Sequence, residues 1–386
     1  RASYGINGTL PNDLYGHLSL YGYGYNYQTI AGSAPASVPN PDLSWERNNN
    51  FNIGFDARLF DRLGITFDYY TRKTTDLLQD VPTSMVVGFT SMLKNVGEMT
   101  NKGFEFAVSS KNFRGEFEWN TDFNISFNKN KLTKLELQKV YYDAKTSDFT
   151  NDYVVRNEPG RSLGGFYGYI SDGVNPETGE LMYRDLNGDG KITTSDRTYI
   201  GDPNPDFTYG MTNTFSWKGF DLTIFLSGSY GNDVLNYNRR YIENPRVNSN
   251  LLKSAANYAV LERINPDGPD DFRNLRVANT STTLPRISAS TTNANNRVSD
   301  LYIEDGSYLR IQNISLGYTL PKKWVNKLNL QNVKVYANLQ NVYTWTNYSG
   351  YDPEVGCMYG DALMNGLDYG RYPSPRIYTF GLNVSF

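Results

Sequence analysis

The chain has 386 residues, a formal net charge of −3 and a mean hydropathy of −0.55. So small a negative charge leaves no basic footprint of the kind that binds nucleic acid. A single cysteine, Cys357, and a single histidine, His17, exclude a disulfide framework, a zinc site of Cys and His, and a relay of several histidines. No run of 18 apolar residues occurs, so the sequence predicts no transmembrane helix.

Aromatic residues make up 15% of the chain, with 31 Tyr against 5 Trp. Tyrosine suits membrane interfaces and also surfaces that bind sugars or peptides. The low mean hydropathy does not exclude a membrane barrel, because half of every spanning strand faces a polar interior. The first residues, Arg1 to Gly5, have the character of the end of a strand already under way, so we expect a fragment whose beginning is missing.

Apolar and polar residues alternate with a period of two, which predicts strands with one apolar and one polar face. In chain order the alternating stretches are 51–59, 65–70, 104–108, 117–127, 207–217, 220–226, 307–320, 333–339 and 377–386. Charged residues keep to the polar faces, and a Lys or Arg facing lipid at mid-depth would cost about 2–4 kcal/mol. The exception is Arg310, which shares parity with Ile314 and Leu316. We expect Arg310 near the outer end of its strand or at a bulge.

Short and long connections also alternate along the chain. The short ones are 61–62, 112–114, 218–219 and 321–330, and the long ones are approximately 6–47, 75–100, 129–204, 231–306 and 345–374. This pattern predicts an all-β, antiparallel, up-and-down transmembrane barrel with long loops outside the cell. We count ten complete strands and the tail of an eleventh, too few to close a barrel without further strands. A soluble all-β protein remains an alternative, but it does not readily explain long loops at every second connection.

The final strand, 377–386, carries the clearest membrane pattern. Alternation over about ten residues matches the length of a tilted strand that crosses a bilayer. The strand ends on Phe386, and a terminal aromatic residue is typical of bacterial outer-membrane barrels. Counting back from a C-terminus on the periplasmic side places every short turn on that side.

The segment Asp185–Asp196 matches a calcium-binding loop. Asp185, Asn187, Asp189 and Asp196 supply oxygens at positions 1, 3, 5 and 12, Gly occupies position 6, and Lys191 would offer its carbonyl. We expect a structural calcium ion that holds a long external loop. The alternative is a turn rich in Asx and Gly that needs no metal.

Tyrosines are dense in the long predicted loops, and their flat faces and hydroxyl tips suit stacking on sugars or holding peptide backbone. The candidate substrate-binding residues are Tyr141, Tyr142, Tyr167, Tyr169, Tyr237, Tyr241, Tyr348 and Tyr351. The alternative for each ring is packing of loop against loop.

Glu116, Glu118 and Asp122 could suggest acid–base catalysis. Their spacing of two instead places them on one polar face beside Asn residues, so we interpret them as a wet lumen wall. We expect no catalytic residue: His17 reads as a loop residue, and Cys357 has no partner.

Several motifs resemble SusC/RagA-type TonB-dependent receptors of Bacteroidetes. They are Asn40-Pro-Asp-Leu-Ser-Trp45-Glu46, Asp68-Tyr-Tyr70 with Thr74 to Leu78, Asn95-Val-Gly97 with Asn101-Lys-Gly-Phe-Glu105, Asn124 to Asn130, the Asp185–Asp196 loop followed by Ile200 to Phe207, and Tyr372-Pro-Ser-Pro-Arg376. Together they span residues 40–386. Residues 1–386 are therefore similar to the C-terminal portion of one receptor barrel domain, about 10–11 of 22 strands.

The resemblance implies TonB-dependent import of oligosaccharides or oligopeptides across the bacterial outer membrane, together with a SusD-like surface lipoprotein. The plug, the segment that contacts TonB and the first strands would belong to the rest of the receptor, and outer-membrane lipid would surround the barrel. Two other functions remain open: a passive or adhesive barrel without energised transport, and a secreted calcium-binding enzyme of β-sandwich type.

Overall fold

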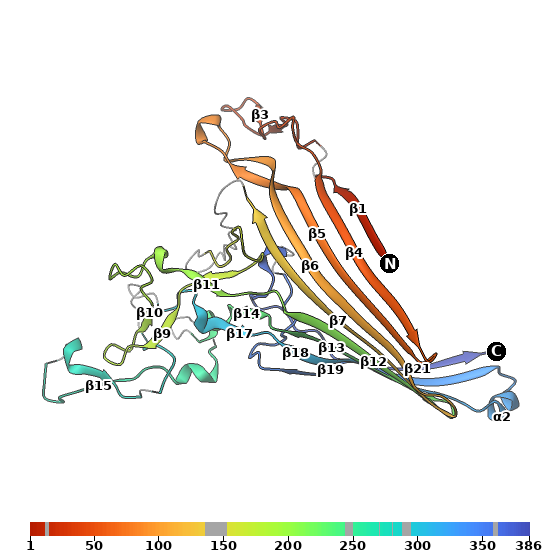
Figure 1. The fold of residues 1–386 in the computed structure, drawn as a ribbon. Coiled ribbons are helices and arrows are strands. Elements are labelled where there is room, and N and C mark those ends of the chain that lie inside the picture. The colour runs from red at the N-terminus through yellow and green to blue at the C-terminus, as the bar shows by residue number, and fades with distance from the viewer. Residues whose placement is uncertain are drawn as a thin grey trace.

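The computed structural model describes residues 1–11, 15–135, 153–243, 250–269, 271–279, 281–287, 295–357 and 362–386. Over these residues the dominant element is a ten-stranded antiparallel sheet, curved and twisted, in which each strand pairs with its neighbours in the chain (Figure 1). Its strands are β1 (Ala2–Thr9), β4 (Glu46–Leu59), β5 (Leu63–Pro82), β6 (Ser91–Phe113), β7 (Phe117–Lys134), β12 (Phe207–Trp217), β13 (Phe220–Tyr230), β18 (Tyr308–Thr319), β19 (Asn332–Thr346) and β21 (Ile377–Ser385). The predicted up-and-down arrangement is confirmed.

Two details of the prediction are wrong. The described sheet has ten strands with β1 included, and not ten complete strands plus the tail of an eleventh. The expected long loop 75–100 is mostly strand, because β5 and β6 continue as a paired hairpin up to Pro82 and Ser91. Apolar and polar residues do not alternate regularly in 75–82 and 91–100, so the sequence pattern gave no sign of this extension.

Tight turns close the strand pairs at one end of the sheet. Lys218 and Gly219 join β12 to β13 with positive φ angles of 48° and 87°, the conformation of the two-residue turns that match strand twist. The turn after β6 begins at Arg114, since Asn112 and Phe113 still belong to the strand. A longer turn with helices α2 (Lys322–Val325) and η6 (Asn326–Leu328) joins β18 to β19.

The two faces of the sheet differ as predicted. On the apolar face, aromatic rings from neighbouring strands form a continuous row, stacked except for the tilted pair Phe127–Phe207, with centroid separations of 4.3–6.3 Å: Phe55, Phe67, Phe104, Phe127, Phe207 and Tyr230. These rings remain partly exposed, because no second layer of the described chain covers them. Such a face is stable when it contacts lipid.

A β-bulge places Arg310 on the polar face. In β18, Asn313 pairs with Phe225 and Ile311 pairs with Leu226, so Gln312 is an extra residue between them. One extra residue reverses the side-chain parity of everything beyond it. Ile311 therefore joins the apolar face, and Arg310 turns inward, opposite Ser227 and Thr344. The expectation of a bulge at Arg310 is confirmed.

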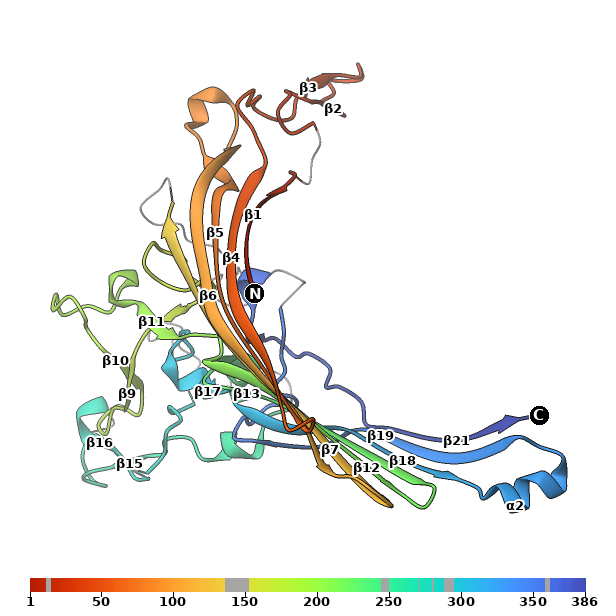
Figure 2. The same cartoon turned by 45° about the vertical axis from the view of Figure 1, so that its right-hand side comes forward.

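Beyond the other end of the strands, the described parts of three long loops, 153–206, 231–306 and 347–376, pack into one unit (Figure 2). Its short elements are β8 (Phe166–Gly168), β9 (Ser171–Val174), β10 (Leu181–Tyr183), η2 (Thr194–Asp196), β11 (Thr198–Gly201), β14 (Asp233–Asn236), α1 (Arg239–Ile242), η3 (Lys253–Ala256), β15 (Leu261–Arg263), η4 (Phe272–Asn274), β16 (Leu275–Val277), η5 (Asp300–Tyr302), β17 (Ile303–Asp305), η8 (Ala362–Met364) and β20 (Leu367–Asp368). Smaller elements elsewhere are β2 (Tyr21–Tyr23), β3 (Ser33–Pro35) and η1 (Met85–Val87).

The main hydrophobic core of the described chain lies in this loop unit and not in the sheet. It consists of Val154, Val155, Phe166, Leu235, Tyr237, Val298, Tyr302 and Leu367, drawn from all three loops. The strand β14 adds backbone pairing, antiparallel to β17 and parallel to β20. Each fully buried side chain contributes roughly 1.5–3 kcal/mol, so the loops form a folded body. No helix in the described ranges is long and apolar enough to cross a membrane.

Candidate functional site

The polar face of the sheet forms a wall rich in amide side chains. One hollow on it has a volume of about 760 Å³ and is lined by Arg1, Asn50, Asn52, Asp68, Tyr70, Thr71, Arg72, Asn101, Glu105 and Asn128. Hydrogen bonds cross the strands here: the Tyr70 hydroxyl donates to Asn128 Oδ1 at 3.0 Å, and Arg72 Nε donates to Asn50 Oδ1 at 2.7 Å. Such a surface offers many weak polar contacts and no fixed deep pocket.

The acidic residues of the predicted lumen wall fit that description. Asp122 is exposed and lines a separate hollow together with Asn120 and Asn124. Glu116 forms an exposed ion pair with Lys218, 3.0 Å between Oε1 and Nζ. Neither carboxyl has the buried environment that a catalytic general acid needs.

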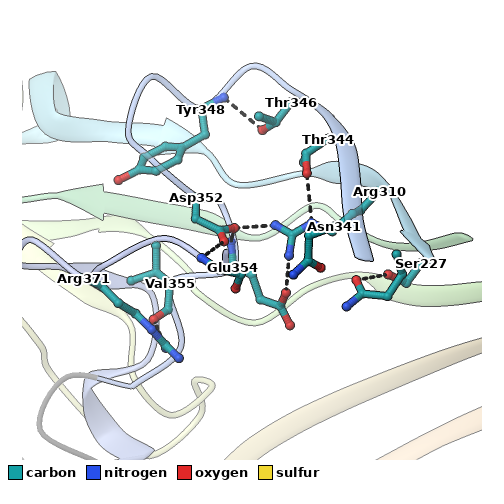
Figure 3. A network of polar contacts seen from close by, with 12 residues as sticks. Ser227, Arg310, Asn341, Thr344, Thr346, Tyr348, Asp352, Glu354, Val355 and Arg371 are labelled. Atoms are coloured by element: carbon teal, nitrogen blue, oxygen red, sulfur yellow. Dashed lines mark hydrogen bonds and ion pairs between the residues drawn. The ribbon is translucent and has the colours of Figure 1, made fainter. Parts of the chain in front are cut away.

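Arg310 attaches the last long loop to this wall (Figure 3). Its guanidinium donates to Asp352, to Glu354 Oε2 at 2.9 Å and to Thr344 Oγ1 at 2.9 Å. The Arg310 and Asp352 side chains are only 3% and 13% exposed, so their ion pair is largely desolvated, whereas the Glu354 side chain is 55% exposed. Burial raises the pKa of Asp352, but the N–H groups of Glu354 and Ser374 and the guanidinium outweigh it, and the pKa lies below its ordinary value.

A second set of polar contacts joins the loops to one another. The Tyr348 hydroxyl donates to Asp368 Oδ2 at 2.5 Å, within the loop 347–376. Glu304 accepts from Arg239 Nη1 at 3.0 Å and from the backbone N–H of Ser349 at 2.8 Å, and so bridges two loops. The loop unit is therefore fixed both internally and to the barrel wall.

The structure buries most of the predicted substrate-binding tyrosines that it describes. Tyr167, Tyr169, Tyr237 and Tyr348 are each at most 8% exposed and pack inside the loop unit, and Tyr241 is half-buried. Tyr351 is 82% exposed, while Tyr141 and Tyr142 lie outside the described residues. The positions of the four buried rings therefore agree with the alternative interpretation, packing of loop against loop. In this conformation none of these four rings has a face open to a ligand.

Arginines that were not singled out in the sequence cover the faces of these tyrosines. Arg156 lies over Tyr167 at 4.7 Å from the ring centroid and also donates to its hydroxyl at 2.6 Å. Arg297 lies over Tyr169 at 4.9 Å, and Arg240 over Tyr237 at 4.5 Å. Cation–π pairs of this kind contribute about 0.5–2 kcal/mol each. Arg156 and Arg240 are close in sequence to the tyrosines they cover, which is a signal that could have indicated them, whereas Arg297 is far from Tyr169 in the sequence.

The 185–196 segment adopts the curled loop that its pattern predicts. Asp185 accepts from the N–H groups of Gly188 and Gly190, each at 2.7 Å, and Asp189 accepts from the N–H of Lys191 at 2.8 Å. Asn187 Oδ1 accepts from the N–H of Asp189 at 2.9 Å. Asn187 and Asp189 are exposed and Asp185 is half-buried, and their side-chain oxygens keep further lone pairs.

Asp196 differs from the other three oxygen donors. It is fully buried, and its carboxylate accepts from the N–H groups of Leu186, Asn187 and Thr193 and from the Thr193 hydroxyl. The pKa of Asp196 is lowered, chiefly by the N–H of Thr193. All four of its acceptor directions are used, so in this conformation Asp196 closes the loop instead of facing an ion. Across the described ranges no three His, Cys, Asp or Glu side chains are gathered around one point.

These features define a class of protein: an up-and-down barrel wall, apolar outside and polar inside, with a folded loop unit at one end. Comparison with known proteins gives the family. The family described as TonB dependent receptor-like, beta-barrel, matches residues 1–342, and the chain belongs to it. Barrels of this family lie in the bacterial outer membrane, and its members are transport proteins and not enzymes.

Individual relatives also belong to the TonB-dependent receptors. TonB-dependent receptor P3 of Formosa agariphila is 36% identical over 411 residues, which cover the whole chain and 39% of that protein. TonB-dependent receptor SusC of Bacteroides thetaiotaomicron is 29% identical, over the whole chain and 37% of its own length. The solved structure of the RagAB peptide transporter matches the whole chain and 40% of its own chain, with 26% identity and a TM-score of 0.82.

The predicted resemblance to SusC/RagA-type receptors is therefore confirmed, as is the partial barrel. The chain spans about two fifths of the length of these relatives.

Proposed function

We propose that residues 1–386 are the C-terminal portion of one receptor barrel domain that imports large nutrients, oligosaccharides or oligopeptides, across the outer membrane. The single observation that carries this proposal is the attachment of the loop unit to the inner wall through Arg310. A folded body held at the mouth of a polar lumen suits cargo that must be captured before it enters. The similarity to the RagAB peptide transporter supports the oligopeptide class without deciding it.

The alternation of long loops and tight turns also predicts how the barrel is oriented in the outer membrane. The long loops would lie outside the cell, and the tight turns and the C-terminus would lie on the periplasmic side. A SusD-like lipoprotein would meet the loops, and TonB would act through a plug that lies in the rest of the receptor. The inner wall would bind cargo weakly at many points, because cargo must also be released inward.

Uptake by cells tests the proposal. Cells that carry the complete receptor should take up labelled cargo, and uptake should stop when TonB is removed or the proton gradient is collapsed with a protonophore. Mass spectrometry of ligand that co-purifies with the intact complex should reveal an oligosaccharide or an oligopeptide. Uptake that continues without TonB would instead support the passive or adhesive barrel.

We further propose that the loop 185–196 binds a structural calcium ion. Asp185, Asn187, Asp189 and the Lys191 carbonyl supply hard oxygen donors around one curl, the chemistry that calcium prefers. Asp196, buried and fully hydrogen-bonded, would hold the loop closed unless it turns toward the ion.

A chelator experiment separates this from a metal-free turn. EDTA should speed proteolysis of the segment around Lys191, and calcium should restore the slower rate. Asp189→Asn should weaken the calcium effect, whereas Asp172→Asn, in an exposed ion pair outside the loop, should not. A proteolysis rate that changes with neither EDTA nor calcium would show that this loop is a turn rich in Asx and Gly that needs no metal.

A further inference from the structure

Three lysines form a basic patch on the apolar side of the sheet, at the loop end of strands β6 and β7. Lys102 is directly opposite Lys129 in the pairing of these strands, and Lys131 is opposite Thr100. Successive side chains alternate between faces, so Lys102 shares the face of Phe104, and Lys129 and Lys131 share the face of Phe127. We refer to Lys102, Lys129 and Lys131 as the lysine patch.

No carboxylate among the described residues pairs directly with the lysine patch. Like charges directly opposite on neighbouring strands destabilise a sheet. All three side chains are exposed, and in the described part of the chain none of them makes an ion pair or a side-chain hydrogen bond. Lys73 on β5, at the same end of the same face, shows the contrast: its Nζ lies 2.9 Å from Glu98. The arrangement therefore calls for an anion from outside the described chain.

The surface beside the lysine patch is shaped and amphipathic. A hollow of about 680 Å³ is lined by the three lysines together with Tyr69, Phe104 and Phe127. The rings of Phe104 and Phe127 stack at 4.3 Å and lie two residues below Lys102 and Lys129, roughly 7 Å along the strands. A ligand here would meet ammonium groups at one end and aromatic rings at the other.

Two carboxylates, Asp202 and Asp206, also line the hollow from the loop side. Asp202 is already engaged, accepting from Ser162 Oγ at 2.5 Å and from Asn204 Nδ2 at 2.7 Å. With Asp206 counted as well, the hollow has three ammonium groups and two carboxylates, so its net charge is positive. Charge complementarity thus favours an anionic group that reaches the lysines from the membrane side.

We propose that the lysine patch binds the phosphate-bearing headgroup of a membrane lipid, with the lipid's acyl chains lying along the aromatic row. The face decides the class of ligand: the lysines lie on the lipid-facing side and not on the lumen wall, so imported cargo does not pass them. Several ammonium donors suit the oxygens of a phosphate group. This inference rests on the membrane placement of the barrel and is independent of the cargo.

Lipid retention by the complete receptor tests the proposal. Wild-type receptor is purified from mixed micelles that contain a bis-phosphorylated lipid A or phosphatidylcholine, and bound lipid is counted by native mass spectrometry. The variant Lys102→Gln/Lys129→Gln/Lys131→Gln should retain at least fivefold less lipid A. The matched control Lys322→Gln/Lys323→Gln/Lys327→Gln removes the same charge from exposed lysines at the opposite end of the strands and should retain the wild-type amount.

The outcomes separate the possible occupants. Equal loss in both variants, or none in either, overturns the proposal, as does release of the lipid by millimolar inorganic phosphate, which would indicate a general anion site. A shift in gel mobility on heating shows that each variant is folded. Cargo uptake, measured in parallel, can fail while lipid retention persists, so failure of the transport proposal is distinguishable from failure of this one.

Discussion

Arg310 of barrel strand β18 and Asp352 of the loop after β19 form an ion pair that is almost completely buried. They are 42 residues apart in the chain, and the pair is possible only because the bulge at Gln312 turns Arg310 inward. The bulge thus converts an arginine that would lie on the apolar face into the anchor of a long loop.

Replacing Arg310 by methionine should release the loop 347–357. Removing one partner of a buried ion pair leaves the other charge without compensation and costs about 3–5 kcal/mol. Hydrogen exchange should show faster exchange of the backbone N–H groups of Glu354 and Ser374, which donate to Asp352. Arg184→Met, which breaks an exposed pair with Asp172, should cost less than about 1 kcal/mol. Unchanged exchange at Glu354 would show that the loop is held by other contacts.

Site-directed labelling should reveal the reversal of parity in β18. Leu309→Cys and Leu316→Cys should both report a lipid environment, although their residue numbers differ by an odd number. Ser315→Cys should report water. A regular strand would place positions 309 and 316 on opposite faces. The labels require Cys357→Ser, because Cys357 is exposed. A nitroxide or a lipid-soluble quencher gives the readout, and a water signal from position 309 would disprove the bulge.

The buried tyrosines should act on stability and not on cargo. Tyr167→Phe removes contacts with Arg156 Nη1 at 2.6 Å and with the Arg197 carbonyl at 2.9 Å, and should destabilise the loop unit by about 1–3 kcal/mol. Tyr351→Phe, at an exposed ring, should leave stability unchanged. Thermal unfolding of the two variants gives the comparison. A weaker affinity for cargo in Tyr167→Phe at unchanged stability would restore Tyr167 as a substrate contact.

Acid should open the loop 185–196. The pKa of Asp196 is lower in the folded loop than its unfolded value of about 3.9, so its stabilisation is complete well above that value. It is lost as the pH falls through the lowered folded pKa, because protonation removes acceptor capacity. Limited proteolysis at decreasing pH should show cleavage rising below about pH 4. Asp196→Asn should show faster cleavage at neutral pH and little further change on acidification.

The faces and hairpins of the barrel were predictable because a period of two is local and survives in every strand. The sequence also indicated the bulge, because Arg310 is charged and yet shares the parity of the apolar residues Ile314 and Leu316. The fate of the tyrosines was not predictable in this way. Whether Tyr167 or Tyr237 faces a ligand or a neighbouring loop depends on segments that meet only in the folded unit, although their arginine partners, Arg156 and Arg240, lie close to them in the sequence. For Asp196, the spacing predicted a loop position correctly but could not show that backbone N–H groups use all of its acceptors.

The core of the loop unit joins Val154, Leu235 and Leu367, which are more than two hundred residues apart at the extremes. Contacts of such long range form late, because the entropy of closing the intervening chain must be overcome first. We expect the strands between them to pair first, since β12, β13, β18 and β19 carry the three loops to one place. The buried rings of that core therefore become protected only when the wall beneath them is complete, so their protection would serve as a reporter of correct assembly in the membrane.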